Sequence, residues 1–403
     1  MTGWTEEQQE FRRVVRRFVE AEVAPRRTEL ELGDLPPYGV LRSYYAAFGL
    51  GDAALDRFRR ASARRADGPG TGAADRSPRS SAAEVLIPMI ELSRWCPGLV
   101  TALGVSVGLA AGTILRSGSA EQRERWAPPL LTLEKVGAWA ITEPDSGSDA
   151  FGSMRTVARP DGDGFVLNGS KTFITNGPYA DTLVVICKLD DGRPPKDREV
   201  LTFVLDRGMP GLAQSGPLRK LGLHSSPTGE VSFADVWVGA DRLLRSSSGG
   251  DAKAQDGVRA NFATERAGVA AMALGVIERC LELAVDYARD RVQFGRRIGD
   301  FQLVQLKLAD MEVARLNVEN LVLGYIAMAD AGRRPSLAEA SAMKLYSARA
   351  AVDVASAAVQ VFGGNGYMAE NHVEQLYRDA RVFQIYGGTD EIQVTHIARD
   401  LLR

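Results

Sequence analysis

The stretch between Gln360 and Gln393 constrains the fold more than any other part of this 403-residue chain. It contains two glycine-rich turns, at 363–366 and 387–388, which are separated by a helical segment. Paired glycines at a helix end allow close approach to the backbone, because no Cβ atom intervenes. Either turn alone is typical of a helix that stops at glycine. The two together, with Tyr377-Arg378-Asp379 between them, form a more specific pattern.

The character of the sequence changes twice along the chain. Residues 1–136 are rich in helix formers, lack strand-type alternation and contain several prolines that stop helices, which predicts an N-terminal helical domain. Short β-branched or aromatic runs at 165–167, 182–186, 201–205 and 230–233 predict a β domain over 137–245. Residues 246–255 are typical of a linker. Helical periodicity then returns over 256–403, with expected helices at 256–291, 301–332 and 336–362 and after Thr389.

The charge balance and the cysteines exclude several classes of protein. With 49 basic and 51 acidic side chains, nothing indicates binding to nucleic acid or to a membrane surface. The uncharged segment Gly98–Leu115 is expected to be a fully buried helix rather than a membrane span. The histidines show no ligand spacing, so no metal site is predicted. The cysteines are far apart and indicate buried thiols in a reducing compartment, and with no signal peptide we expect a cytoplasmic protein (Cys96, Cys187, Cys280).

Four segments resemble motifs of the acyl-CoA dehydrogenase family. Residues 141–149, ITEPDSGSD, resemble its first flavin segment, and residues 171–177, KTFITNG, resemble the second, with Phe173 where tryptophan is common. Residues 291–302 resemble its R..FG..I..FQ helix, and the two glycine turns resemble its C-terminal signature. The four segments stand in the family's order and cover most of the chain from about residue 120 onward, so the signal is specific.

This resemblance implies an α+β fold of three parts: an N-terminal helical domain, a middle β-barrel-like domain and a C-terminal four-helix bundle. It implies FAD as the cofactor, and no G-x-G-x-x-G follows a strand, so flavin binding would not be of Rossmann type. It also implies an acyl-CoA or acyl carrier protein substrate and an electron-transfer flavoprotein as electron acceptor. In the family, C-terminal helices of one subunit complete the flavin site of a neighbour, which implies a homotetramer built as a dimer of dimers.

The resemblance also suggests which residue is the catalytic base. Oxidation of a saturated thioester to the 2,3-enoyl form needs a base at the α carbon, a hydride acceptor and donors for the thioester oxygen. Many members supply the base as the glutamate of an I-Y-E-G-T segment, but here Gly387 stands in its place. Long-chain and isovaleryl-CoA dehydrogenases instead carry a glutamate before an arginine on the first long C-terminal helix, where this chain has Glu265-Arg266. Glu265 is therefore the predicted base, although such a pair is also common on solvated helix faces.

The other roles follow from the same motifs. Gly387 keeps a backbone N–H that can donate to the thioester oxygen. The residues expected near the substrate are Ser148, Arg266, Tyr386 and Gly388. The residues expected to hold FAD are Ile141, Thr142, Gly147, Ser148, Phe173, Ile174, Thr175, Arg291, Phe294, Gln302, Gln360, Gly363, Gly364, Thr389 and Glu391.

Two questions stay open at the level of sequence. Residues 57–81 contain seven arginines and almost nothing apolar, which is typical of a loop or a solvated insertion. The alternative is an arginine patch that recognises phosphate or an acidic carrier protein. The reaction is also open to two alternatives: an oxygen-using relative, either an acyl-CoA oxidase or an N-hydroxylating monooxygenase, or a non-catalytic binding or scaffold protein that kept the fold.

Overall fold

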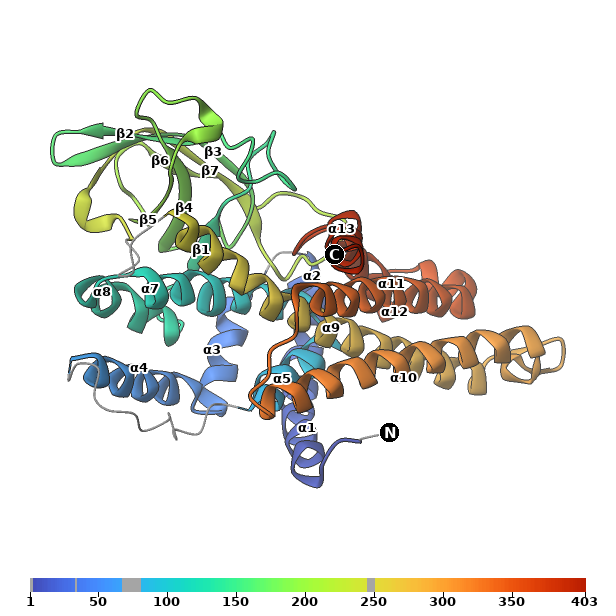
Figure 1. The fold of residues 1–403 in the computed structure, drawn as a ribbon. Helices are drawn as coiled ribbons and strands as arrows, with labels where there is room; N and C mark the ends of the chain where they lie inside the picture. Colours follow the sequence, from blue (N-terminus) through green and yellow to red (C-terminus); the bar gives the residue numbers. More distant parts are fainter. Residues whose placement is uncertain (1–2, 33–34, 67–80, 245–250) are drawn as a thin grey trace.

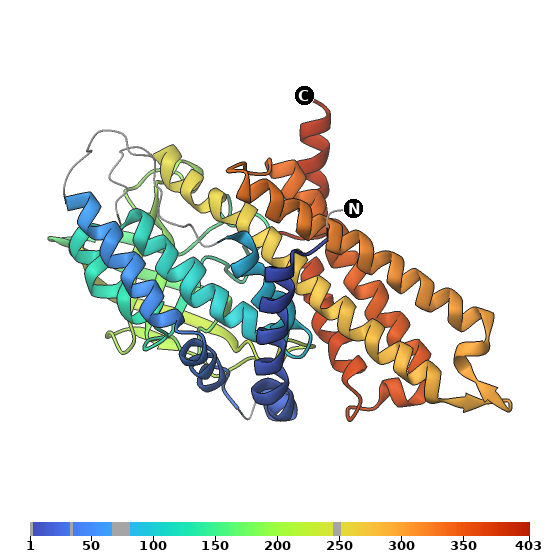
Figure 2. The ribbon, with the colours of Figure 1, turned by 90° about the horizontal axis from the view of Figure 1, so that it is seen from below.

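The computed structural model describes residues 3–32, 35–66, 81–244 and 251–403, with the backbone alone at 66 and 251–264. The described chain runs through helices, then a β sheet, then helices again, as predicted (Figure 1). The sheet lies over the helices that precede it, and the long C-terminal helices extend to one side (Figure 1). Seen from below, the N-terminal helices, in blue to cyan, and the C-terminal helices, in orange to red, meet near the middle of the molecule (Figure 2).

The N-terminal part is helical throughout most of its described length. α1 begins with a capping box between Thr5 and Gln8, and its apolar face buries Val15. The elements are α1 (Glu6–Phe18), η1 (Val19–Val23), η2 (Ala24–Arg26), α2 (Arg27–Leu32), α3 (Tyr38–Ala47), α4 (Leu50–Ala66), α5 (Ala82–Ser93), α6 (Pro97–Leu103), η3 (Gly104–Ala111), α7 (Gly112–Ser117) and α8 (Ala120–Leu131).

Two expectations for this part need correction. Residues 57–66 belong to α4 and are not a loop, because Ala54 and Phe58 form an apolar stripe that packs with Trp126 of α8 while the arginines, good helix formers, point to solvent. The rest of the arginine-rich segment, 67–80, lies outside the described residues. The segment Pro97–Ser117 is helical, but only half of its apolar window is buried. Among the described residues it is the one helical stretch long and apolar enough to cross a membrane.

The middle part is a curled, mainly antiparallel sheet. Its strands are β1 (Gly137–Ala140), β2 (Val157–Asp161), β3 (Gly164–Thr175), β4 (Thr182–Leu189), β5 (Val200–Asp206), β6 (Leu212–Gln214) and β7 (Thr228–Gly239), with 3-10 turns η4 (Pro195–Asp197) and η5 (Ala240–Arg242). The order is β1-β4-β2-β3-β7-β6, and β5 pairs with β4. The four predicted runs lie in β3, β4, β5 and β7. The strands β1, β2 and β6 were not predicted, because they are short and show little alternation of apolar and polar residues.

The C-terminal part consists of long packed helices. They are α9 (Asp251–Asp290), α10 (Gln302–Asp330), α11 (Leu337–Phe362), α12 (His372–Ala380) and α13 (Asp390–Leu401), with a hairpin of β8 (Val292–Gln293) and β9 (Arg296–Arg297) and short turns η6 (Ile298–Asp300), η7 (Gly363–Tyr367) and η8 (Arg381–Gln384). Residues 251–255, expected in the linker, are the first turns of α9. α5 lies so close to α9 that a side chain at Gly275 would collide with the carbonyl oxygen of Ile90. This contact joins the N- and C-terminal parts.

Candidate active site

Two positions that are 122 residues apart in sequence meet at the centre of the molecule. Glu265 lies on α9, and Gly387 lies in the turn between η8 and α13. A Cβ atom built on Gly387 would stand 3.5 Å from the Glu265 Oε1 atom. The turn needs glycine at both of its central positions, since Gly387 has φ +61° and Gly388 has φ +86°. The fold therefore brings the carboxylate of Glu265 to the place that a side chain at 387 would enter.

The surroundings of Glu265 suit a proton-accepting carboxylate. Burial raises the pKa of Glu265, and the positive charges of Arg266 and Lys344 oppose this rise in pKa. Burial also raises the pKa of the Tyr386 hydroxyl, which donates to the Met272 sulfur at 3.6 Å. The Arg266 side chain is buried, and its Nη2 atom lies 3.3 Å from Nδ1 of His396. A carboxyl group with a raised pKa among apolar and aromatic neighbours is well matched to abstracting a proton.

The two predicted flavin segments of the β domain are tied together by a buried ion pair. Lys171 Nζ lies 2.8 Å from Glu143 Oε1 and also donates to the Ile141 carbonyl at 2.9 Å. Glu143 accepts two further backbone N–H bonds, from Arg155 and Thr156. These contacts fix the loop of residues 141–148 against β3. Gly147 and Ser148 remain exposed at its surface, while the side chains of Ile141 and Ile174 are buried, so those two residues can offer a ligand only their backbone.

Phe173 stands out beside this loop. Its ring is 68% exposed, and its backbone has φ +56° at a point where the pairing of β3 with β7 shifts register. A bulky residue in the left-handed region is strained, and such strain gathers at functional sites. Asn176, two residues beyond β3's Ile174, anchors the strand by donating to the carbonyls of Ala102 and Gly137 and by accepting from Tyr38. An aromatic ring held outward on a fixed strand suits contact with a flat ligand.

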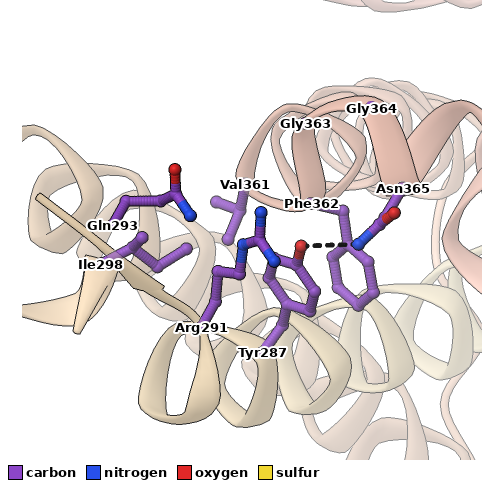
Figure 3. A pocket seen from close by; sticks show the side chains of 9 residues that line it. All are labelled: Tyr287, Arg291, Gln293, Ile298, Val361, Phe362, Gly363, Gly364 and Asn365. Carbon is purple, nitrogen blue, oxygen red and sulfur yellow. Dashed lines mark hydrogen bonds between the residues drawn. The ribbon is translucent and has the colours of Figure 1, made fainter.

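A second group of predicted residues lines a separate pocket at the far end of α9 (Figure 3). Arg291 and Tyr287 face the turn Gly363-Gly364 across a space of about 300 Å³, and Asn365 donates to the Tyr287 hydroxyl at 2.9 Å. Nearby, Phe294 is 94% exposed and has φ +52°. An exposed arginine beside open backbone glycines fits an anionic group such as a diphosphate. Arg291 and the first glycine turn, predicted separately, are thus brought together.

The structure does not bring the two groups of predicted residues together within one chain. Glu265 lies on α9 and Arg291 directly follows the last residue of this helix, so the two are separated by 26 positions, which is about 39 Å along the helix axis. Gln302 and Gln360 are exposed at the distant end with Arg291. Thr389 caps α13 by accepting from the Ile392 N–H, beside exposed Glu391, at the end where Glu265 lies. Within one chain the two groups therefore form two separate half-sites.

Several residues that shape the site were missed at the level of sequence. Glu143 and Lys171 stand inside the two flavin segments, but nothing in the sequence showed that they pair. Lys344 and Gln393 donate hydrogen bonds to the backbone of the Gly387–Gly388 turn. In the sequence, neither residue differs from an ordinary polar helix residue. The only indication in the sequence was that Lys344 and Gln393 occupy helix positions at which apolar or small residues would be expected. Their partners are distant in sequence, so only the folded chain identifies them.

The chemical groups present fit a flavin. At one end of α9, the outward ring of Phe173 and a carboxyl with a raised pKa suit an aromatic ring system beside a base. At the other end, Arg291 beside a glycine turn suits a diphosphate. The fold and this site together define a flavin-dependent dehydrogenase of helical–β–helical build.

Comparison with known proteins identifies the family. Models of the acyl-CoA dehydrogenase N-terminal, middle and C-terminal domains match residues 72–134, 138–236 and 256–402. An acyl-CoA dehydrogenase of Bacillus subtilis is 36% identical over 400 residues, covering 99% of this chain and 98% of that protein. Butyryl-CoA dehydrogenase from Megasphaera elsdenii superposes with a TM-score of 0.85 at 32% identity over 100% of both chains. The prolyl acyl carrier protein oxidase AnaB has a TM-score of 0.82 at 27% identity, covering 99% and 100% of the two chains.

The chain belongs to the acyl-CoA dehydrogenase family. It is an oxidoreductase that dehydrogenates acyl-CoA, and its cofactor is FAD. The predicted α+β fold is confirmed.

Proposed function

We propose that Glu265 is the base that removes the α proton of an acyl thioester. The observation that carries this proposal is the 3.5 Å separation between the Glu265 carboxylate and the missing Cβ of Gly387. A base on α9 and a base in the turn would reach the same point in space, so Glu265 compensates for the glycine. Its raised pKa favours proton uptake.

The remaining residues divide the work of binding. The N–H of Gly387 donates to the thioester oxygen and stabilises the charge that grows there as the proton leaves. Tyr386 and the adjacent apolar residues hold the acyl group near Glu265, with Ser148 and Arg266 at the edges of the substrate site. When bound, FAD supplies the acceptor for the β hydride, and it would be held by the 141–148 loop, Phe173 and Thr175.

An anaerobic titration with a panel of acyl-CoAs tests this assignment. The wild-type flavin should bleach with at least one substrate, whereas Glu265→Gln should bind the same thioester with a shift of the flavin spectrum and no bleaching. Equal bleaching rates for both proteins would show that another residue is the base. A Glu282→Gln variant, on a distant turn of the same helix, is the matched control and should behave as the wild type.

We further propose a homotetramer built as a dimer of dimers, in which each flavin site draws on two subunits. The distance between the Glu265 and Arg291 ends of α9 supports this, because the second half-site must come from a neighbour. A mostly apolar groove of about 810 Å³ between α10 and α11 offers a surface for such contacts (Leu321, Gly324, Met328, Met343, Tyr346). Light scattering should give a mass near four times the 43.5 kDa of one chain.

The proposed partners follow from the same family. The acyl group arrives on CoA or on an acyl carrier protein, and an electron-transfer flavoprotein removes the electrons in the cytoplasm. A second function is favoured by the similarity to AnaB, a prolyl acyl carrier protein oxidase. In that case molecular oxygen would reoxidise the flavin directly. Stopped-flow mixing of the reduced protein with air-saturated buffer separates the two, since fast reoxidation supports the oxidase and slow reoxidation supports the dehydrogenase.

A further inference from the structure

Lys344 is a buried cation directly beneath the turn of Gly387. It lies in the third turn of α11, its side chain is wholly shielded from solvent, and its Nζ atom donates to the Gly388 carbonyl at 2.8 Å. The Asp390 carboxylate is 3.9 Å away. A fully buried lysine is rare unless it is paired, because its desolvation is costly. Here its closest bond goes to a backbone carbonyl, which indicates a role in holding the turn.

The turn is fixed from the same side by a second donor. The Gln393 amide nitrogen donates to the carbonyls of Gly387 at 3.1 Å and Gly388 at 2.8 Å. A side chain at 388 would be strained by the φ of +86°, and its Cβ would stand 2.7 Å from that nitrogen, so the Gln393 side chain would have to move. The Gly388 carbonyl thus accepts from both Lys344 and Gln393, and the Gly387 carbonyl accepts from Gln393. These hydrogen bonds fix the orientation of the peptide groups to which the two carbonyls belong. Each carbonyl lies in the peptide plane that follows its own residue, so these two side chains orient the Gly387–Gly388 and Gly388–Thr389 peptides and hold the turn to which the Gly387 N–H belongs.

We propose that Lys344 is a positioning residue, which orients the Gly387–Gly388 turn for the thioester oxygen and supplies a fixed positive charge that favours the ionised form of Glu265. This inference rests on the proposed function, because it takes Glu265 as the base and Gly387 as the oxygen donor. It adds a residue that touches neither substrate nor flavin and acts through these two.

The charges around Lys344 come from three elements. α9 presents Glu265 and Arg266, and α13 presents Asp390 and Glu391. On α11 itself Arg349 pairs with Asp390 at 3.0 Å from an exposed position. Burial lowers the pKa of Lys344 to about 8, and the nearby carboxylates oppose this decrease because they favour the charged form. Lys344 thus stays charged at neutral pH, where it acts on Glu265 through a low-dielectric interior.

Two substitutions separate the charge of Lys344 from its hydrogen bond. Lys344→Gln keeps a donor and loses the charge, and Lys344→Met loses both. In the pH profile of kcat/KM, Lys344→Gln should move the acid limb upward by about one unit. Lys344→Met should show the same shift and should also bind a 3-thia-acyl-CoA, which has no β hydrogen to lose, about tenfold more weakly. Arg349→Met removes a cation from the same helix and the same Asp390, and its acid limb should not move.

The outcomes are distinct. An unmoved acid limb in Lys344→Gln overturns the electrostatic role, and undiminished 3-thia-acyl-CoA affinity in Lys344→Met overturns the positioning role. If neither variant retains flavin, Asp390→Asn serves instead. It leaves Lys344 in place but removes a carboxylate that favours its charge, so the alkaline limb should move to lower pH, and an unmoved limb counts against the proposal. Failure of Glu265 as base would appear separately, as activity in Glu265→Gln, while thia-analogue binding still reports on the turn.

Discussion

The carboxylate of Glu265 lies 3.5 Å from the point at which a Cβ atom of residue 387 would stand, so a side chain at 387 would enter the space beside this carboxylate. Under the proposed mechanism, a base at that point could be supplied from either of two distant positions in the sequence. The turn at residue 387 and helix α9 are separate elements, so either one can carry the carboxylate while the other has a small residue at the facing position.

This relationship predicts that the base can be transplanted. Glu265→Ala should lower kcat by about 10³-fold, within the range expected for loss of a general base. Adding Gly387→Glu should restore part of that loss, because the new carboxylate enters the same space. Restoration should be incomplete, since φ +61° at 387 costs a non-glycine residue about 1–3 kcal/mol.

The control for this experiment is Gly387→Gln on the Glu265→Ala background, which fills the same volume without a base. Both double variants should lose thermal stability to a similar degree, and only the glutamate should regain activity. Equal activity of the two double variants would show that the position supplies packing rather than proton transfer.

The activity should depend on the protonation states of two groups, one of which must be deprotonated and the other protonated. As the proposed base, Glu265 must be deprotonated, and burial raises its pKa, so kcat/KM should rise with pH through a range above that of ordinary carboxyls. Lys344 works when protonated and has a pKa of about 8, so the rate should fall again as pH rises past that value. Initial rates across pH 4.5–10, checked against flavin content at each pH, measure both limbs. A profile for Lys344→Gln that keeps the alkaline limb would assign that limb to another group.

Much of the fold could be predicted because the pattern changes along the chain. Long periodic segments such as 336–362 appear as α11 within one residue, and the β-branched runs lie within β3, β4, β5 and β7. The start of α9 was missed since residues 251–255 are polar and small, so the helix there carries no apolar periodicity. Residues 57–66 of α4 were wrongly expected to be a loop, because two buried side chains, Ala54 and Phe58, are enough to hold a helix whose other positions are mostly solvated.

The candidate site was less accessible to sequence reasoning than the fold. The motifs located Glu265, Phe173 and Arg291, yet they could not say that Arg291 lies about 39 Å from Glu265 on the same chain. The supporting pairs, Lys171 with Glu143 and Lys344 with the turn, join residues between 28 and 44 positions apart. Such pairs depend on three-dimensional packing and leave no local spacing to detect.

Loss of the buried pair beneath the flavin loop should destabilise the protein. Lys171→Met leaves the Glu143 carboxylate buried with its cation gone, which is expected to cost about 3–5 kcal/mol. Thermal unfolding should show a lower Tm, and FAD should be released more readily because the 141–148 loop loses its anchor. Replacing Glu143 with Gln in the same variant should recover part of the stability, since no unpaired charge then remains.

A neighbouring ion pair provides the comparison. Arg155 and Asp145 lie 2.9 Å apart at the surface of the same loop, with both side chains mostly exposed. Arg155→Ala should change stability by no more than about 1 kcal/mol, because solvent screens exposed pairs. A similar loss for Arg155→Ala and Lys171→Met would mean that the loop, rather than burial of the pair, governs stability.

The two half-sites at opposite ends of α9 predict complementation between subunits. Glu265→Gln disables the base end, and Arg291→Glu disables the distant pocket, so each variant alone should be inactive. When the two chains are unfolded together and refolded as mixed oligomers, a site that takes Glu265 from one chain and Arg291 from its neighbour is intact. About a quarter of wild-type activity should return for random pairing into symmetric dimers. Refolding Glu265→Gln with Phe173→Asp, two changes at the same end, should restore none. If both mixtures stay inactive while wild type refolds well, each flavin site would have to be built from a single chain.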